Sequence, residues 1–308
     1  VLHYKGHEVG RLDTHFLHEG IPQPVREAVW DSNAATQVRS DAARLVCSST
    51  PSLRHSVTPS LLSLLSHPNI ASKHWIIRQY DHEVQGNTVV KPLVGPDQRG
   101  PGDAAVIEPI PGGNRGIALA CGLSIWQGVE AGGRYPGDPY LTTLAGIDEC
   151  VRNLVCVGAD PSRIAILDNF CWPSCEKPEN LGALVRAAEA CYDGAKAYRA
   201  PFVSGKDSLN NQLRYTDPAT GEKVVIEVPP TLLITGMGIV PNLSRCVTMD
   251  AKAPGHALLL VGRTLAAMGG SHYAHLFGGT NTDFARVDLT IGPATARAVA
   301  QCIRDGLV

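Results

Sequence analysis

The segment VSGKDSLNNQ places several chemically capable side chains next to one another. Gly205 is followed directly by Lys206, Asp207 and Ser208. A flexible backbone, a cation, a carboxylate and a hydroxyl at consecutive positions suit a phosphate or metal site. A P-loop is excluded, because it needs an earlier glycine and a hydroxyl directly after the lysine, whereas Ala200 and Asp207 occupy those positions. The alternative is an ordinary polar turn.

Oxygen-bearing side chains form a second candidate site. Glu149 and Asn153 lie in LTTLAGIDECVRNLVCVGADP, whose apolar spacing predicts a helix, and their separation puts both on one helix face. Asp103 precedes an apolar run that predicts a strand. Carboxylate and amide oxygens are the ligands that Mg²⁺ prefers, with waters and nucleotide phosphates completing the octahedron. The alternative is a solvated helix face and an aspartate in a turn.

A third candidate is Asp168, at the end of a predicted strand in SRIAILDNF. A long helical pattern follows, and then PFVSGKDS predicts a strand that runs into a loop around Gly205. Because ligands of α/β sheets bind at the carboxyl ends of strands, we expect Asp168 to contact a nucleotide or its metal there. Lys206 would neutralise a phosphate. The alternative role of Asp168 is to cap a helix.

Other elements must position these groups. The sequence predicts a short strand pair around Gly6, a short helix in TPSLLSLLSHPNIAS, and neighbouring buried strands in DAAVIEP and GIALACGLSIW. It predicts a further strand in TLLITGMGIV, a helix or linker over 31–50, and a final helix from Gly292 to Asp305. DAKAPGHALLLVGRT predicts a linker followed by the first strand of a new domain. The alternation of strands and helices indicates an α/β fold.

Length and composition narrow the class of protein. The chain has 308 residues, for which two domains are the default expectation, and is 44% hydrophobic and 18% charged, as in soluble globular proteins. The net charge of -2 gives no electrostatic case for nucleic acid or an anionic membrane as a partner. Neither a membrane-spanning run nor an export signal is visible, so a cytoplasmic location is expected. The nine scattered cysteines are expected to be reduced thiols.

Taken together, these segments resemble the phosphoribosylformylglycinamidine synthase family, within the aminoimidazole-ribonucleotide synthetase superfamily. The resemblance is carried by LLSLLSHPNIASKHWIIRQYDHEVQGNTVVKP, GDAAVI, DECVRNLVCVGADP, LDNFCWPSCEKPEN, PFVSGKDSLNNQ, and GHALLLVGRT with GGSHY. The family synthetase has two related halves, each with a barrel-forming domain and an α/β domain. The chain looks like the second half only.

The resemblance implies a domain plan. Residues 1–49 would be the tail of a preceding C-terminal-type domain with a linker, and residues 50–250 the second barrel-forming, N-terminal-type domain. Residues 251–308 would be the start of a final C-terminal-type α/β domain, truncated at its end.

The resemblance also implies an activity. The family converts formylglycinamide ribonucleotide, ATP and glutamine-derived ammonia into formylglycinamidine ribonucleotide, ADP and phosphate in purine biosynthesis. Its cofactors are Mg²⁺ and ATP or ADP. The implied partners are that ribonucleotide, the missing first half of the synthetase and a glutaminase domain or subunit. A second copy of the chain is a further candidate partner, through the barrel-forming domain.

Site residues carry over from the family by position. Asp168 and Gly205 match nucleotide-contacting residues, with Lys206 beside them, and Ser208 matches a substrate-contacting serine. Asp103, Glu149 and Asn153 match ligands of the Mg²⁺ that accompanies an auxiliary nucleotide.

Three departures limit what this chain would do alone. Lys206 stands where compact family members have a metal-ligating asparagine, the segment with the family's catalytic histidine has no counterpart, and an Asp-rich segment expected after residue 308 is missing. The isolated chain is therefore expected to be inactive. The alternatives are a scaffold that holds a structural nucleotide, or another ATP-using member of the superfamily.

Overall fold

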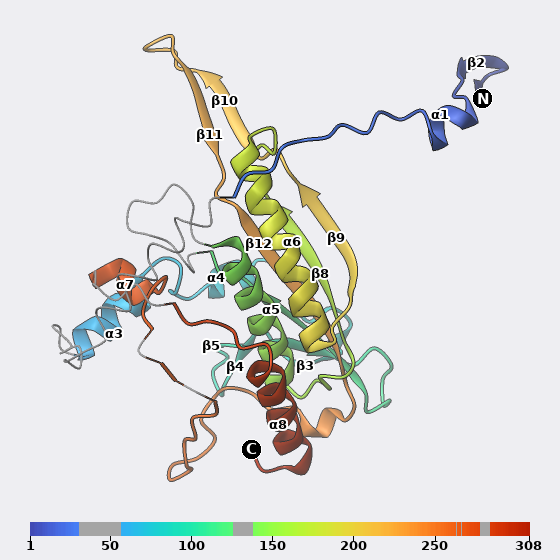
Figure 1. The fold of residues 1–308 in the computed structure, drawn as a ribbon. Helices are drawn as coiled ribbons and strands as arrows, with labels where there is room; N and C mark the ends of the chain where they lie inside the picture. Colours follow the sequence, from blue (N-terminus) through green and yellow to red (C-terminus); the bar gives the residue numbers. More distant parts are fainter. Residues whose placement is uncertain (31–56, 126–137, 263, 266, 278–283) are drawn as a thin grey trace.

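A mixed six-stranded sheet organises the molecule, as seen in a computed structural model that describes residues 1–30, 57–125, 138–262, 264–265, 267–277 and 284–308 (Figure 1). The strand order is β3-β6-β7-β12-β8-β9. These strands are β3 (Thr88–Val90), β6 (Ala105–Ile107), β7 (Gly116–Gly122), β12 (Thr231–Val240), β8 (Ile164–Cys171) and β9 (Phe202–Ser208). Neighbours are antiparallel except β8 and β9, which are parallel.

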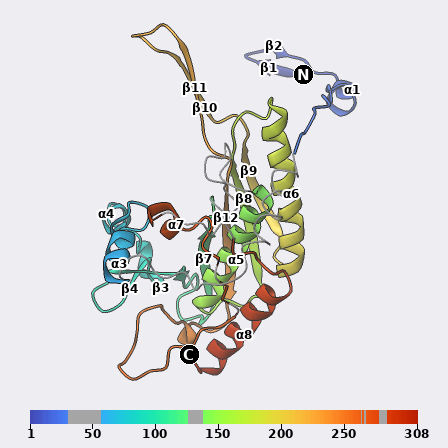
Figure 2. The same cartoon turned by 60° about the vertical axis from the view of Figure 1, so that its left-hand side comes forward.

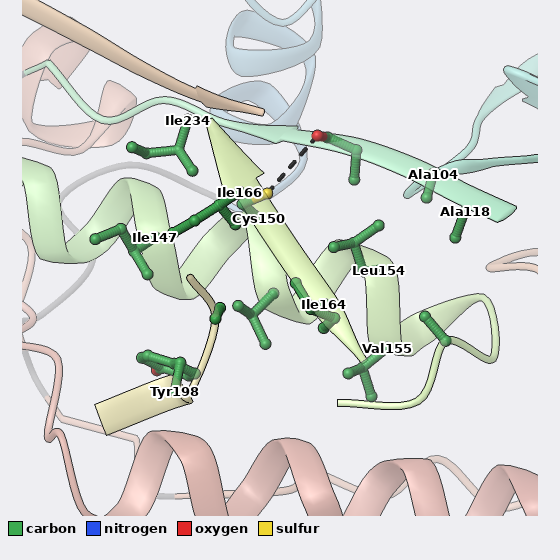
Figure 3. Packing of buried hydrophobic residues seen from close by; sticks show 14 of the residues in the cluster. Ala104, Ala118, Ile147, Cys150, Leu154, Val155, Ile164, Ile166, Tyr198 and Ile234 are labelled. Carbon is green, nitrogen blue, oxygen red and sulfur yellow. Dashed lines mark hydrogen bonds between the residues drawn. The ribbon is translucent and has the colours of Figure 1, made fainter. Parts of the chain in front are cut away.

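Two long helices cover one face of this sheet, α5 (Pro139–Cys156) and α6 (Pro178–Tyr198) (Figure 2). Both begin with proline at the first helical position, where its missing N–H costs nothing, and Asp138 caps α5 by accepting from the Tyr140 N–H. The buried residues of α5 recur at helical spacing and face the sheet, among them Ile147, Cys150 and Leu154 (Figure 3). The core therefore lies between the helices and the sheet.

The C-terminal helix α8 (Ile291–Asp305) packs against α5, and its buried residues Ala296 and Ala300 belong to the same core cluster. The 3₁₀ segments are η1 (Val84–Gly86) and η2 (Leu243–Arg245). The remaining elements are small: β1 (Leu2–Tyr4), β2 (His7–Gly10), α1 (Thr14–His18), α3 (Val57–Ser66), α4 (His74–Ile77), β4 (Leu93–Val94), β5 (Gly100–Pro101), α7 (His272–Phe277) and the hairpin of β10 (Gln212–Thr216) and β11 (Lys223–Glu227). In Figure 1 this hairpin projects beyond the ends of the other strands.

Most sequence expectations for individual elements are confirmed, including the strand pair around Gly6 and the helices α5, α6 and α8. The residues 31–50, expected to be a helix or linker, lie outside the described part of the chain. The strand predicted in GHALLLVGRT is wrong: residues 256–262 have no regular structure, and Leu258 is 96% exposed. A strand needs a neighbour for its backbone hydrogen bonds, and no described strand pairs with this run.

Within the described ranges, no helix is both long and apolar enough to cross a bilayer.

Candidate functional site

The predicted residues lie on or near β7, β8 and β9 of the same sheet. β7 and β8 each run antiparallel to β12, and β9 is parallel to β8, so β7, β8 and β9 point the same way. Gly122 at the end of β7 and Asp168 on β8 are both paired with Ile234 of β12. Since adjacent strands are spaced by about 4.8 Å, their Cα atoms lie about 10 Å apart. The shared strand direction agrees with the sequence expectation. The expected placement of Asp168 and Gly205 at strand ends is wrong, because β8 continues to Cys171 and β9 to Ser208.

Glu149 and Asn153 reach from α5 to the end of β7. The Leu123 backbone N–H donates to Glu149 Oε2 at 2.7 Å, and Asn153 Nδ2 donates to the Cys121 carbonyl at 2.9 Å. These bonds fix both side chains and use one polar atom of each. Glu149 Oε1 and Asn153 Oδ1 remain as the oxygens that can bind a cation, because the amide donates through nitrogen.

Asp103 lies two residues before β6, the strand that neighbours β7 in the sheet. Ala105 pairs with Leu119 of β7, so Asp103 directly precedes the segment that lies beside β7. Partial burial raises the pKa of the Asp103 carboxyl above its usual value. Its charge also helps to raise the pKa of Cys156, the last residue of α5, after the larger effect of burial.

These donors suit a hard divalent cation. A half-buried carboxylate whose pKa is raised by burial is stabilised when a cation binds it, and the three residues supply only oxygen ligands. Among the described residues, no three His, Cys, Asp or Glu side chains form a metal-ligand group. The two carboxylates and one amide would therefore depend on waters and phosphates for the remaining ligands, as Mg²⁺ sites commonly do.

Asp168 and Gly205 are in direct contact across the parallel pair of β8 and β9. They share a register position, and a Cβ added to Gly205 would lie 2.6 Å from Asp168 Oδ1 and 2.9 Å from Oδ2. A side chain at position 205 would therefore displace this carboxylate from its present position. Asp168 Oδ1 is buried without a hydrogen-bond partner among the described residues. Burial first, and then the charge of Asp207, raise the pKa of Asp168.

Lys206 and Ser208 lie on the other face of β9 from Gly205, because successive side chains of a strand alternate. The Lys206 ammonium donates to Ser208 Oγ. The loop expected here is wrong: β9 continues to Ser208, where the chain still pairs with Cys171 of β8. The structure therefore divides the predicted group into Asp168 with Gly205 on the helix side of the sheet and Lys206 with Ser208 on the opposite side.

Sequence reasoning missed the residues that hold these side chains in place. The end of β7 binds them through two backbone groups on either side of Gly122, the Cys121 carbonyl and the Leu123 N–H. One signal was present, since an isolated glycine within a predicted strand indicates close approach of another backbone. The described cysteines are free thiols, as expected.

Comparisons with known proteins identify relatives. Residues 101–240 match the family model described as AIR synthase related protein, N-terminal domain. The phosphoribosylformylglycinamidine synthase subunit PurL of Gloeobacter violaceus is 35% identical over 70% of this chain and 26% of its own length. The same subunit of Thermococcus sibiricus is 34% identical over 82% of this chain and 31% of its own length. The chain thus spans about a third or less of the curated relatives that it matches.

Solved structures give a weaker likeness. PurLQS from Thermotoga maritima matches 58% of this chain and 25% of its own chain, with 26% identity and a TM-score of 0.43. T. maritima PurL complexed with ATP matches 57% of this chain and 24% of its own chain, with 25% identity and a TM-score of 0.39. The relationship therefore rests on the sequence matches: residues 101–240 match the AIR synthase related N-terminal domain family, and the chain is similar in sequence to the PurL subunit of phosphoribosylformylglycinamidine synthase.

Proposed function

We propose that this chain supplies a nucleotide and magnesium site to an ATP-dependent synthase of purine biosynthesis. The reaction would convert formylglycinamide ribonucleotide and glutamine-derived ammonia into formylglycinamidine ribonucleotide, a C–N bond-forming ligation in the cytoplasm. The name and sequence similarity of the PurL relatives support this reaction. The single observation that carries the site is that Glu149 and Asn153 are fixed at the end of β7 with one oxygen of each left for a cation.

The residues of the proposed site would bind different parts of the magnesium–nucleotide complex. Asp103, Glu149 and Asn153 would hold Mg²⁺, which when bound offsets the charge of nucleotide phosphates. The orphan Asp168 Oδ1 requires a hydrogen-bond donor, because a buried acceptor without a partner is costly. A hydroxyl or amino group of the nucleotide supplies such a donor, whereas a phosphate does not.

Lys206 and Ser208 would act on the opposite face of β9. The ammonium attracts a phosphate as a point charge, and the hydroxyl can donate to or accept from a polar substrate group. Lys206 would thus assist nucleotide binding, and Ser208 would contact the ribonucleotide substrate.

The complete reaction needs more than this chain. We propose that it works as part of a longer synthetase, with a first half that completes the catalytic site and a glutaminase domain or subunit that delivers ammonia. The limited coverage of the PurL relatives, 26% and 31% of their lengths, supports this division.

Calorimetry tests the nucleotide and magnesium site. ADP and ATP are titrated into the chain with and without Mg²⁺, and into Asp103→Ala. The matched control is Asp97→Ala, which removes an exposed carboxylate in an ion pair with Arg99. We expect Mg²⁺-dependent binding by the wild type and the control, and its loss in Asp103→Ala. Absence of binding by the wild type, or equal binding by all three proteins, would contradict the proposal.

A second candidate function is a structural nucleotide module without turnover. It is favoured by the observation that Glu149 and Asn153 each use one polar atom to bind the backbone at the end of β7, as side chains that connect a helix to a sheet do. Two results would together support this function over the first. The nucleotide would stay bound to the wild-type complete synthetase through washing, and the complete synthetase would still turn over when Asp103 is replaced by alanine.

A further inference from the structure

The contact between α5 and the end of β7 is made through strand backbone. Three side chains from consecutive turns of α5 bind it: Cys150 Sγ donates to the Ala120 carbonyl at 3.7 Å, Asn153 Nδ2 to the Cys121 carbonyl, and Glu149 Oε2 accepts from the Leu123 N–H. Figure 3 shows the first of these bonds as a dashed line between α5 and β7. Such close binding requires the helix and the strand to approach within side-chain reach on both sides of residue 122.

Gly122 is the residue at which the two backbones meet. A Cβ added there would overlap the Gly146 carbonyl oxygen and lie 2.7 Å from the Cys150 nitrogen. Cys150 follows Gly146 by four positions, so these two atoms are the acceptor and donor of one helical hydrogen bond. Both are backbone atoms, which cannot rotate away as a flexible side chain would. Any larger residue at position 122 must therefore move the helix or the strand.

The opposite side of this contact has more room. A Cβ added to Gly146 would lie 3.4 Å from the Gly122 carbonyl oxygen and 3.6 Å from Ile234 Cγ1, which are ordinary contact distances. A side chain is thus sterically excluded at Gly122, whereas a methyl group can be accommodated at Gly146. Since Glu149 is three positions after Gly146, a shift of this turn also moves the carboxylate that binds Leu123.

We propose that Gly122 is a positioning residue for the magnesium–nucleotide site, because it lets α5 lie close enough to β7 for Glu149 and Asn153 to be fixed at the strand end. The inference rests on the proposed function, since it concerns the same cation. Residues that orient metal ligands typically change metal affinity by about 10- to 100-fold when they are replaced. Gly122 would act in this way through the two ligands and would touch neither the cation nor the nucleotide.

The test is the Mg²⁺ dependence of ADP binding by Gly122→Ala, measured by calorimetry over a series of Mg²⁺ concentrations. We expect the Mg²⁺ concentration for half-maximal ADP binding to rise by about 10-fold or more, and ADP binding to recover at saturating Mg²⁺. A purely structural role predicts a different result, namely fewer binding-competent molecules with an unchanged Mg²⁺ midpoint. That result would overturn the inference.

Two further glycine variants serve as controls. Gly146→Ala adds a methyl group at the same contact where space exists, and Gly238→Ala strains the same core, because its Cβ would lie 2.9 Å from Ala159 Cβ. Both should keep the wild-type Mg²⁺ midpoint. A Gly238→Ala midpoint shifted as far as that of Gly122→Ala would also overturn the inference, because the effect would then reflect general strain.

A second variant keeps the test decisive if Gly122→Ala loses its helical circular dichroism. Leu123→Pro removes the N–H that Glu149 accepts without adding volume at the helix contact. It should raise the Mg²⁺ midpoint in the same direction, and an unchanged midpoint would overturn the inference. Failure of the wild type to bind ADP with Mg²⁺ is a separate result, because it overturns the proposed site itself.

Discussion

At the scale of single residues, Asp168 is a carboxylate in an unfavourable environment. Its Oδ1 is buried and lacks a partner among the described residues, and Asp207 adds a like charge nearby. Glu149, in contrast, accepts a backbone N–H and is exposed to solvent. An unfavourable buried charge is commonly retained where a ligand compensates it, at a cost in stability.

We predict that Asp168→Asn stabilises the ligand-free protein at pH 7 by about 1 kcal/mol, because the amide carries no charge to bury. The pKa of Asp168 is raised in the folded state. The stability deficit of the wild type is therefore fully present above that folded-state pKa. It decreases as the pH falls, and disappears below the unfolded pKa near about 3.9.

Urea unfolding of both proteins between pH 7.5 and pH 4 measures this difference. The control is Asp97→Asn, since Asp97 is a mostly exposed carboxylate that pairs with Arg99. If Asp168→Asn is less stable than the wild type at pH 7, or if the difference does not change with pH, then burial of the Asp168 charge does not destabilise the folded wild-type protein. A gain in stability accompanied by weaker nucleotide binding would agree with a ligand-binding role.

At the scale of elements, a buried polar contact joins α5 to α6 beside the start of α8. The Tyr198 hydroxyl donates to the buried Asp148 carboxylate, which also pairs with Arg152. A Cβ added to Gly292, in the first turn of α8, would overlap this hydroxyl. The start of the C-terminal helix therefore depends on where the Tyr198 ring is fixed.

We predict that Tyr198→Phe lowers the free energy of unfolding by about 2 kcal/mol, the scale of a hydrogen bond to a charged group. Amide hydrogen exchange should also increase in the first turn of α8, measured by mass spectrometry. Tyr192→Phe is the matched control on the same helix, because Tyr192 is exposed and accepts a hydrogen bond only from Lys196 among the described contacts. Equal effects of the two changes would show that the buried hydroxyl has no special part in docking α8.

Sequence patterns predicted the long elements that pack against another described element. α5 and α6 have one apolar face, β8 and β12 are apolar runs, and each is buried against another described element. The run at 256–262 has the same apolar character but no pairing strand, so pattern alone gave the wrong element. The hairpin of β10 and β11 was missed, although its turn sequence DPATG between two β-type runs is a recognisable signal.

The candidate site was predictable to a similar extent. Helical spacing placed Glu149 and Asn153 on one face. The strand, helix and strand pattern predicted that Asp168 and Gly205 lie on strands of one sheet, and the structure pairs these two residues directly. Spacing could not show that both α5 side chains bind the backbone on either side of Gly122, because this depends on how closely two elements pack. Nor could it show that Lys206 and Gly205 face opposite sides of the sheet, since the sequence pattern predicts a loop around Gly205.

At the scale of the whole molecule, the sheet has helices α5 and α6 on one face and exposed apolar side chains on the other. Leu119 of β7 and Met237 of β12 are cross-strand partners on that face, with 39% and 48% of their surface exposed. Their neighbours Cys121 and Thr235 are also paired and only weakly polar. Apolar surface of this kind is removed from water by association.

We predict that the isolated chain self-associates through this face of the sheet, and that the double variant Leu119→Asp, Met237→Asp remains a monomer. Burying four carboxylates between two copies would cost more than the apolar contact contributes. Sedimentation velocity over a hundredfold range of protein concentration measures the association. The control is Val185→Asp, which places one charge at an exposed apolar position of α6, on the other side of the sheet. A wild type that stays monomeric throughout, or a Val185→Asp variant that dissociates as fully as the double variant, would contradict the prediction, because association would then be absent or would involve the helical face.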